Sequence, residues 1–256
     1  MRTKTLLLSA AALAAGLVSS FASSSNVYSV NIVGYVNKAT AGGVSAIGNP
    51  LIANGGNNPT NVFPNADGHL DFNVLLVWNG LSFDQYYFDS TKSSGFTDGG
   101  GTATLFPPNL NPGTGFLYNN IIGDPQSTFV GQVTGVVTND PHLLATVTLP
   151  GSPLLQLITS PIPLGGGVIS SLQFGGTAVP GDGSLDFDAV LVPTISGGSI
   201  IGYVTSYFDS TKANGFTDGS GTATLPEPVI PVAGAFFFAN YNGSPYTWNQ
   251  DINLGP

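Results

Sequence analysis

The chain has 256 residues, of which only five are Lys or Arg and 14 are Asp or Glu, so its formal net charge is −9. A chain this acidic lacks the basic surface that binds phosphate backbones, which excludes nucleic acids as partners. It has no cysteine, and its 35 Gly, 19 Pro and 42% hydrophobic residues predict short packed strands joined by many turns.

Residues 1–22 are predicted to be a secretory signal peptide. Arg2 and Lys4 precede an apolar run from Leu6 to Val18, and small residues follow up to Ala22. The run is shorter than the roughly 20 apolar residues that span a membrane, and no second run follows it. The sequence therefore predicts export to the periplasm, the cell surface or the extracellular space, without a membrane span.

Residues 23–35 are predicted to hold an N-terminal strand, because apolar and polar residues alternate over Val27–Val36. Two roles are open for this strand. It either completes a sheet within its own chain, as sequential elements usually do, or it exchanges into a neighbouring copy through an unpaired sheet edge.

The remainder of the chain consists of two tandem copies of one sequence unit. The nineteen residues Tyr87–Leu105 return as Tyr207–Leu225 with sixteen identities at an offset of 120. Two copies of one sequence place matching residues in matching environments. Alignment outward from this match predicts three segments: repeat 1 at residues 36–134, a connector at 135–142 and repeat 2 at 143–256.

Each repeat contains short apolar runs bounded by Gly, Pro, Asn or Asp, which is typical of strands and hairpins. In repeat 1 we expect strands at Val44–Ile52, Val74–Trp78, Ser82–Phe88, Thr114–Asn119 and Thr128–Val133. In repeat 2 we expect them at Leu154–Ser160, Ala189–Pro193, Ile201–Phe208, Ala235–Asn240 and Tyr246–Ile252. Short helical turns are expected at Thr60–Phe63 and Ile169–Phe174. The predicted fold is all-β: two tandem pseudo-repeated antiparallel modules, either sandwiches or barrel-like.

Several motifs of repeat 1 follow one another in a fixed order, namely VYSVNIVGYVN, GVSAIGNPL, LVWNG and LNPGTGFLY. As an ordered set they resemble a family of secreted two-repeat β proteins from Verrucomicrobiota and related bacteria. The resemblance covers nearly the whole mature chain and implies export and a two-repeat organisation, but no catalytic residues. Repeat 2 departs from these motifs with IPVAGAF and a longer PTISGGSIIG hairpin, so the two copies need not bind alike.

Asp89 and Asp209 stand in matching FDST segments, which suggests one carboxylate from each lobe of a bilobal acid protease. Such enzymes carry glycine two residues after the aspartate, where this chain has Thr91 and Thr211. An aspartate that caps a turn is the alternative, and we favour it. The only histidines, His69 and His142, have no counterpart in the other repeat and no nucleophile motif beside them.

Clustered carboxylates suggest a calcium site, since calcium prefers oxygen ligands. The spacing D-G-x-L-D-F-D is not that of an EF-hand, and a solvated strand face is the alternative. The candidate metal ligands are Asp67 and Asp71 in repeat 1 and Asp182, Asp186 and Asp188 in repeat 2.

Two aromatic residues and two loop carboxylates are candidates for ligand binding. Trp78 precedes a predicted Asn-Gly turn and could stack on a sugar, Trp248 is a second candidate, and burial in the core is the alternative for both. Asp98 and Asp218 lie in the glycine-rich segments GFTDGGGT and GFTDGSGT, which suit a tight turn or a ligand loop. If these loops bind, each should contribute about half of the binding.

These features favour a secreted, non-enzymatic structural or adhesion protein that works within an extracellular assembly of its own copies. The alternative is a carbohydrate-binding module that uses calcium to bind an extracellular polysaccharide. A bilobal acid hydrolase is the third reading.

Overall fold

The computed structural model describes residues 33–40, 42–123, 126–137, 142–164, 166–175 and 183–253. The fold is all-β, as expected: 48% of the described residues lie in strands and 4% in helices. The described helices are one turn each, α2 (Pro59–Val62) and the 3-10 helix η1 (Ile169–Leu172), close to the two predicted turns. No helix in these ranges is long and apolar enough to cross a membrane. The signal peptide and Val27–Ile32 fall outside the described residues.

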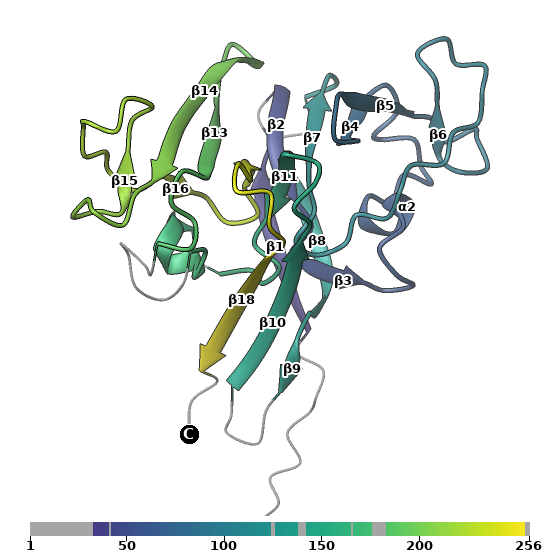
Figure 1. Cartoon of the computed structure of the whole chain (residues 1–256). Helices are drawn as coiled ribbons and strands as arrows, with labels where there is room; N and C mark the ends of the chain where they lie inside the picture. The colour runs from purple at the N-terminus through teal and green to yellow at the C-terminus, as the bar shows by residue number, and fades with distance from the viewer. Residues whose placement is uncertain are drawn as a thin grey trace, which may run out of the picture. The chain divides into compact units, whose positions relative to one another are not determined.

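Repeat 1 contains a five-stranded antiparallel sheet (Figure 1). Its strands, in spatial order, are β2 (Gly43–Gly48), β7 (Gly115–Asn120), β4 (Val74–Trp78), β5 (Phe83–Phe88) and β6 (Phe96–Thr97). The predicted strand Val44–Ile52 is interrupted at Pro50, which has no backbone N–H to donate to a ladder. The chain changes sheets there, and β3 (Leu51–Ala53) pairs with another strand.

Repeat 2 contains a five-stranded sheet with the same order. Its strands are β11 (Leu155–Thr159), β17 (Ala235–Ala239), β13 (Ala189–Ser196), β14 (Ser199–Phe208) and β15 (Phe216–Thr217). The β13–β14 hairpin carries the extra residues of repeat 2 and has a register shift between Thr194 and Ile195. The duplicated sequences thus form sheets of the same topology.

A smaller sheet accompanies each large one. In repeat 1, β1 (Val33–Ala39), β8 (Gln126–Val133) and β3 lie in the order β1-β8-β3. In repeat 2 the order is β18 (Tyr246–Asn253), β10 (His142–Leu149) and β9 (Val136–Val137), and β12 (Gly167–Val168) pairs separately with β16 (Val229–Ile230). Because Val36 of β1 pairs with Phe129 and Val147 of β10 with Trp248, β1 and β10 are equivalent. The described part of the N-terminal strand therefore pairs within its own chain and extends past the predicted boundary at residue 36.

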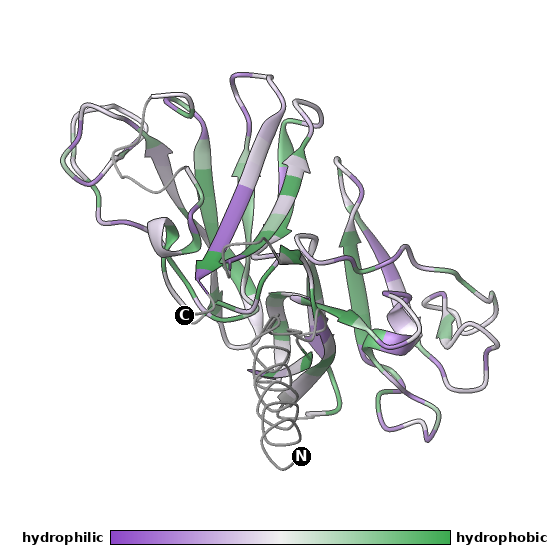
Figure 2. Ribbon diagram, turned by 90° about the horizontal axis from the view of Figure 1, so that it is seen from below, coloured by the Kyte–Doolittle hydropathy of each residue, from purple (hydrophilic) through white to green (hydrophobic). Residues whose placement is uncertain are grey.

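Each repeat has its own aromatic core between its large and small sheets. Phe63 lies in the centre of the first core, with ring centroids 5.5–5.8 Å from those of Phe88, Phe116, Tyr118 and Phe129. Phe174 is its equivalent in the second core and lies among the rings of Phe208, Phe236, Phe238, Tyr246 and Trp248. Phe88, Phe116, Phe208 and Phe236 are buried, as predicted. In Figure 2 long hydrophobic stretches lie in the strands, whereas the projecting loops are mostly of intermediate hydropathy.

A third core joins the two repeats. Leu117 of β7 packs with Leu157, Ala235 and Phe237 of repeat 2, and the partly buried Leu76 and Leu191 lie against them. Two isolated bridges cross the same contact: Ile47 pairs with Gly234, and Ile158 pairs with Thr114.

These two bridges are the same contact made twice, since Ile47 is equivalent to Ile158 and Thr114 to Gly234 by the sequence offsets. Two backbone bonds repeat the pattern, from Gly48 N to Ala233 O (3.0 Å) and from Thr159 N to Gly113 O (3.1 Å). The repeats therefore meet through one patch used by both, like the subunits of a two-fold symmetric dimer.

Candidate functional site

The carboxylates of Asp98 and Asp218 organise their own loops. Asp98 Oδ1 accepts hydrogen bonds from Thr102 N (2.8 Å) and Ala103 N (3.1 Å). Asp218 Oδ1 makes the same bonds with Thr222 N (3.1 Å) and Ala223 N (3.3 Å). The backbone amides of the loop hold the pKa of Asp98 below its usual value, whereas for Asp218 the Ser220 hydroxyl is the main cause.

Asp89 and Asp209 also cap turns. In each case Oδ1 accepts a hydrogen bond from the backbone N–H two residues later, at Thr91 and Thr211, with a distance of 3.0 Å. The threonine hydroxyl donates to the same oxygen, and this bond is the main cause of the lowered pKa of each aspartate. Asp209 lines a cavity formed by repeat 2 residues alone, so Asp89 does not share a site with it there.

The predicted calcium ligands are not gathered into one cluster. Asp71 and Asp186 each accept two bonds from a serine, Ser90 (2.7 and 2.8 Å) and Ser210 (both 2.7 Å), which ties the turn before β4 or β13 to the segment after β5 or β14. Asp67 accepts from His69, and Asp182 falls outside the described residues. In those residues no group of three or more His, Cys, Asp or Glu side chains could hold a metal ion.

Asp188 is buried, with 2% of its surface exposed. Its Oδ1 accepts a hydrogen bond from Asn242 N (2.9 Å), which fixes the loop that follows β17. Burial raises the pKa of Asp188 above its usual value. Its role is therefore to position the Tyr241–Asn242 turn.

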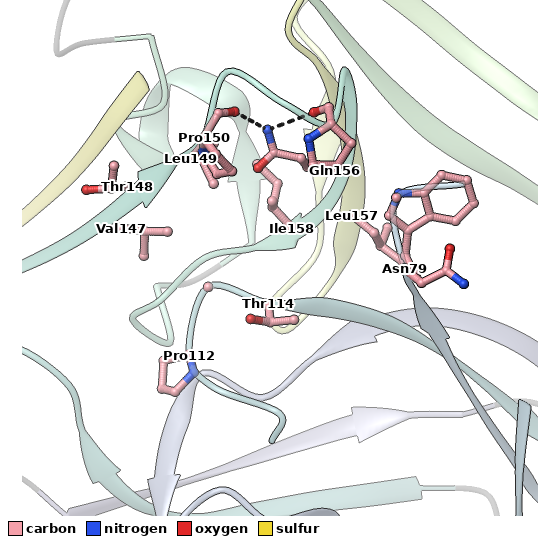
Figure 3. A pocket seen from close by; sticks show the side chains of 14 residues that line it. Asn79, Pro112, Thr114, Val147, Thr148, Leu149, Pro150, Gln156, Leu157 and Ile158 are labelled. Carbon is pink, nitrogen blue, oxygen red and sulfur yellow. Dashed lines mark hydrogen bonds between the residues drawn. The ribbon is translucent and has the colours of Figure 1, made fainter. Parts of the chain in front are cut away.

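Trp78 lies at the junction of the repeats, where it lines a cavity of about 390 Å³ (Figure 3). Its indole N–H donates to Leu155 O of repeat 2 at 2.8 Å, and its ring meets those of Phe83 and Phe237 edge to face. Gln156 in the same cavity donates to Pro150 O at 2.7 Å. Trp78 thus holds the two repeats together, and its one polar group is already used.

Hairpin tips make the same kind of contact from both sides. Gly80, at the tip after β4, lies against Pro153 of repeat 2. Gly198, at the tip after β13, accepts a hydrogen bond from Val44 N of repeat 1 at 2.8 Å, and Gly43 lies too close to it to carry a Cβ. The β4–β5 and β13–β14 hairpins, which differ in length between the copies, therefore each contact the other repeat through their tips.

Trp248 has no exposed surface, and its indole N–H donates to Leu172 O at 2.9 Å. It packs edge to face on Phe174 with centroids 4.8 Å apart. A ligand cannot reach this ring, so Trp248 belongs to the core and not to a binding surface.

The strongest candidate site is a surface cavity of about 640 Å³ in repeat 2. It is lined by the aromatic residues Phe187, Tyr207, Phe208 and Tyr241, the carboxylates Asp186, Asp209 and Asp218, and the loop residues Thr211, Thr217, Gly219, Ser220 and Gly221. The sequence analysis singled out Asp186, Asp209 and Asp218 among these residues, but it assigned them to different candidate roles and did not join them to one site.

Two tyrosines form one wall of this cavity. Tyr207 and Tyr241 stack with centroids 6.2 Å apart and an interplanar angle of 22°. The Tyr207 ring lies against the loop, where a Cβ on Gly219 would be 3.4 Å from Cε2. Burial, with a further contribution from Tyr207, raises the pKa of the Tyr241 hydroxyl.

Phe187 adopts a positive φ, which residues with bulky side chains normally avoid. Its φ is +75°, and 76% of its surface is exposed. The backbone is held by a bond from Phe187 N to Phe208 O at 3.0 Å, while the buried Leu185 anchors the turn. Strain of this kind costs about 1–3 kcal/mol and persists where the surrounding structure enforces it, often at ligand sites.

Repeat 1 has most of the same parts but lacks one ring. Phe72 matches Phe187 in φ (+74°) and exposure (72%), and Tyr87 matches Tyr207 over Gly99. The position of Tyr241 is taken by Ile121, whose side chain is 57% exposed. The stacked pair therefore has no counterpart there. The Ile121/Tyr241 difference was visible in the aligned sequences, but nothing in the sequence showed that this turn approaches the GFTDG loop.

Comparison with known proteins adds no relative. No protein-family model matches the chain, and neither a curated protein nor a solved structure matches it.

Proposed function

We propose that this protein is an exported, non-enzymatic adhesion protein that binds an extracellular polysaccharide through the cavity of repeat 2. The observation that carries the proposal is the stacked Tyr207–Tyr241 pair beside the exposed Phe187, in one cavity with loop carboxylates. Exposed aromatic rings offer flat apolar faces to the C–H groups of a pyranose, and polar groups at the rim fix the sugar hydroxyls.

The polar groups needed for this role are present at the cavity. Thr211 and Ser220 are exposed and carry hydroxyls, and Asp209 and Asp218 lie beside them. A carboxylate accepts strong hydrogen bonds from hydroxyl donors. Together with the rings, these groups match a sugar with both an apolar and a polar side.

The signal-peptide pattern of residues 1–22 supports export. The turn-capping bonds of Asp89 and Asp209 support a non-catalytic role, because each carboxylate has a structural partner within its own loop. The indole N–H groups of Trp78 and Trp248 are engaged inside the fold, whereas the Tyr207–Tyr241 pair lines a surface cavity.

A glycan array with the mature protein tests the proposal, with Tyr207→Ala as the diagnostic variant. Tyr87→Ala is the matched control, because Tyr87 occupies the same position on the repeat 1 loop. We expect Tyr207→Ala and Tyr241→Ile to abolish sugar binding and Tyr87→Ala to retain it. An equal loss of sugar binding in Tyr207→Ala and Tyr87→Ala would contradict the assignment of the site to repeat 2. An array without any bound sugar would contradict the function.

The same array run with a chelator tests the calcium hypothesis. We expect binding to survive, since Asp186 and Asp218 already accept bonds from the protein's own donors.

A further inference from the structure

The charge of the repeat 2 cavity specifies its ligand further, on the premise of the polysaccharide function proposed above. Its charged lining residues are all acidic: Asp186, Asp209 and Asp218. The positive charge of Lys212 contributes to the lowered pKa of Asp209, but Lys212 is not among the lining residues. A ligand that enters this cavity therefore meets net negative charge next to aromatic faces.

The three carboxylates differ in how much of their hydrogen-bonding capacity is free. Both oxygens of Asp186 accept from Ser210, at 2.7 Å each, so this side chain is committed to the fold. Asp218 Oδ1 accepts hydrogen bonds from the loop amides, and the hydroxyl of exposed Ser220 lies 2.9 Å from both Oδ1 and Oδ2. In the described part of the chain, Ser220 is the partner found for Oδ2.

Asp209 has one oxygen to spare. Oδ1 accepts from the N–H and the hydroxyl of Thr211, and no partner of Oδ2 is found in the described ranges of the chain. The cavity thus presents Asp209 Oδ2 and, in part, Asp218 Oδ2 as acceptors.

We infer that the polysaccharide carries free amino groups, as in chains of glucosamine, and that the repeat 2 cavity binds one protonated amine through the carboxylates of Asp209 and Asp218. An ammonium group supplies three donors and a positive charge to these oxygens. The faces of Tyr207, Tyr241 and Phe187 attract the same cation through their ring quadrupoles. A sugar with an N-acetyl group in this place would leave the acidic charge uncompensated.

The rest of the chain favours the same ligand. With a net charge of −9, the protein attracts polycations over a distance and repels anionic polysaccharides. The lowered pKa values of Asp209 and Asp218 keep both carboxylates ionised at mildly acidic pH, where sugar amines are protonated.

Titration calorimetry with three β-1,4-linked hexasaccharides, of glucosamine, N-acetylglucosamine and glucose, tests the inference. We expect the glucosamine chain to bind at least tenfold more tightly than the other two at low salt. The preference should shrink as sodium chloride is raised, because salt screens exposed charges.

Asp209→Asn keeps the Oδ1 acceptor for Thr211 and removes the charge. It should lower the affinity for the glucosamine chain about tenfold and lower the affinity for the glucose chain by a clearly smaller factor, because the asparagine amide oxygen still accepts hydrogen bonds from hydroxyl groups. Asp89→Asn, the matched change in repeat 1, should have no effect on either. Circular dichroism and the retained binding of the glucose chain would show that the variant is folded.

The outcomes separate this inference from the function on which it rests. Equal affinity for all three chains, or an equal effect of Asp209→Asn and Asp89→Asn, would overturn the amino-sugar inference and leave sugar binding in place. If oligolysine of equal charge displaces the glucosamine chain at the same concentration, the site recognises charge alone and the inference also fails. Absence of binding to any chain would count against the polysaccharide function itself.

Discussion

Gly48 of β2 and Thr159 of β11 occupy equivalent positions in the two repeats and lie directly against each other. A Cβ on Gly48 would come within 2.2 Å of Thr159 Cγ2. The next pair along the contact behaves alike, since a Cβ on Gly115 would lie 2.8 Å from that of its equivalent, Ala235. At each pair one repeat supplies a side chain and the other supplies the space for it, so the two copies have diverged to fit one another.

Gly48→Ala is expected to lower the stability by about 1–3 kcal/mol, because the added methyl overpacks the contact between the repeats. Thermal unfolding measures this loss. The double variant Gly48→Ala/Thr159→Gly should recover part of this stability, because removal of the Thr159 side chain makes room for the added methyl group. Destabilisation without any recovery would mean that the cost arises within β2 and not at this contact.

A second difference between the repeats concerns the hydrogen-bonded pair Asn73 and Tyr118. Asn73 Nδ2 donates to Tyr118 Oη at 2.7 Å, and Asn73 Oδ1 accepts from Ile121 N at 2.7 Å. In repeat 2 the equivalents are Asp188 and Phe238, so the amide donor and its hydroxyl partner are lost together. Asp188→Asn alone would place an unpaired N–H₂ group in a buried site, at a cost of about 1–3 kcal/mol. Asp188→Asn/Phe238→Tyr should restore the pair and the stability.

The same aspartate predicts a pH dependence. The folded-state pKa of Asp188 is raised, so its protonated form favours the fold at low pH, and this contribution is lost as the pH rises through the folded pKa. Denaturant titrations between pH 4 and pH 7 should show a decline in wild type that the double variant lacks. An identical pH profile in both proteins would contradict the role of Asp188.

The sequence predicted the repeat-containing all-β fold well and the site poorly. Most strands were found because their runs are bounded by turn residues. The strand β10 was missed although LLATVTL alternates as a strand should, because the first strand of repeat 2 was expected only at Leu154–Ser160. Trp248 was selected for its residue type, and only the packing shows that it is buried. Phe187 could not be singled out, since no sequence pattern predicts a phenylalanine at positive φ. Tyr241 joins the GFTDG loop through the sheet order β17-β13-β14-β15, which sequence offsets do not reveal.

We expect Phe187 to lower the stability of the fold through its positive φ and to strengthen sugar binding through its ring. Asparagine tolerates positive φ far better than phenylalanine, so Phe187→Asn is expected to raise the stability by about 1 kcal/mol and to weaken sugar binding. Phe72→Asn relieves the same strain in repeat 1 and should raise the stability without any effect on binding. Thermal unfolding and calorimetry of both variants check this; a Phe187→Asn protein with full affinity would remove the ring from the site.

Asp98 and Asp218 provide the sharpest contrast between the copies. As caps they are alike: each folded-state pKa is lowered, so the loop stabilisation is complete above the usual value of 3.8 and is lost as the pH falls through the folded pKa. Amide protection of Thr102 and Thr222 should therefore disappear together on acidification, as hydrogen exchange can measure.

In binding the two should differ, contrary to the equal halves that the duplicated loops suggest. Asp218 lines the cavity together with Tyr241, whereas in repeat 1 the position equivalent to Tyr241 is occupied by Ile121. One charge-assisted hydrogen bond contributes about 1.5 kcal/mol, so Asp218→Asn should weaken sugar binding about tenfold. Asp98→Asn should leave the affinity and the stoichiometry of one ligand per chain unchanged. Two ligands per chain, each lost with one aspartate, would show instead that both loops bind.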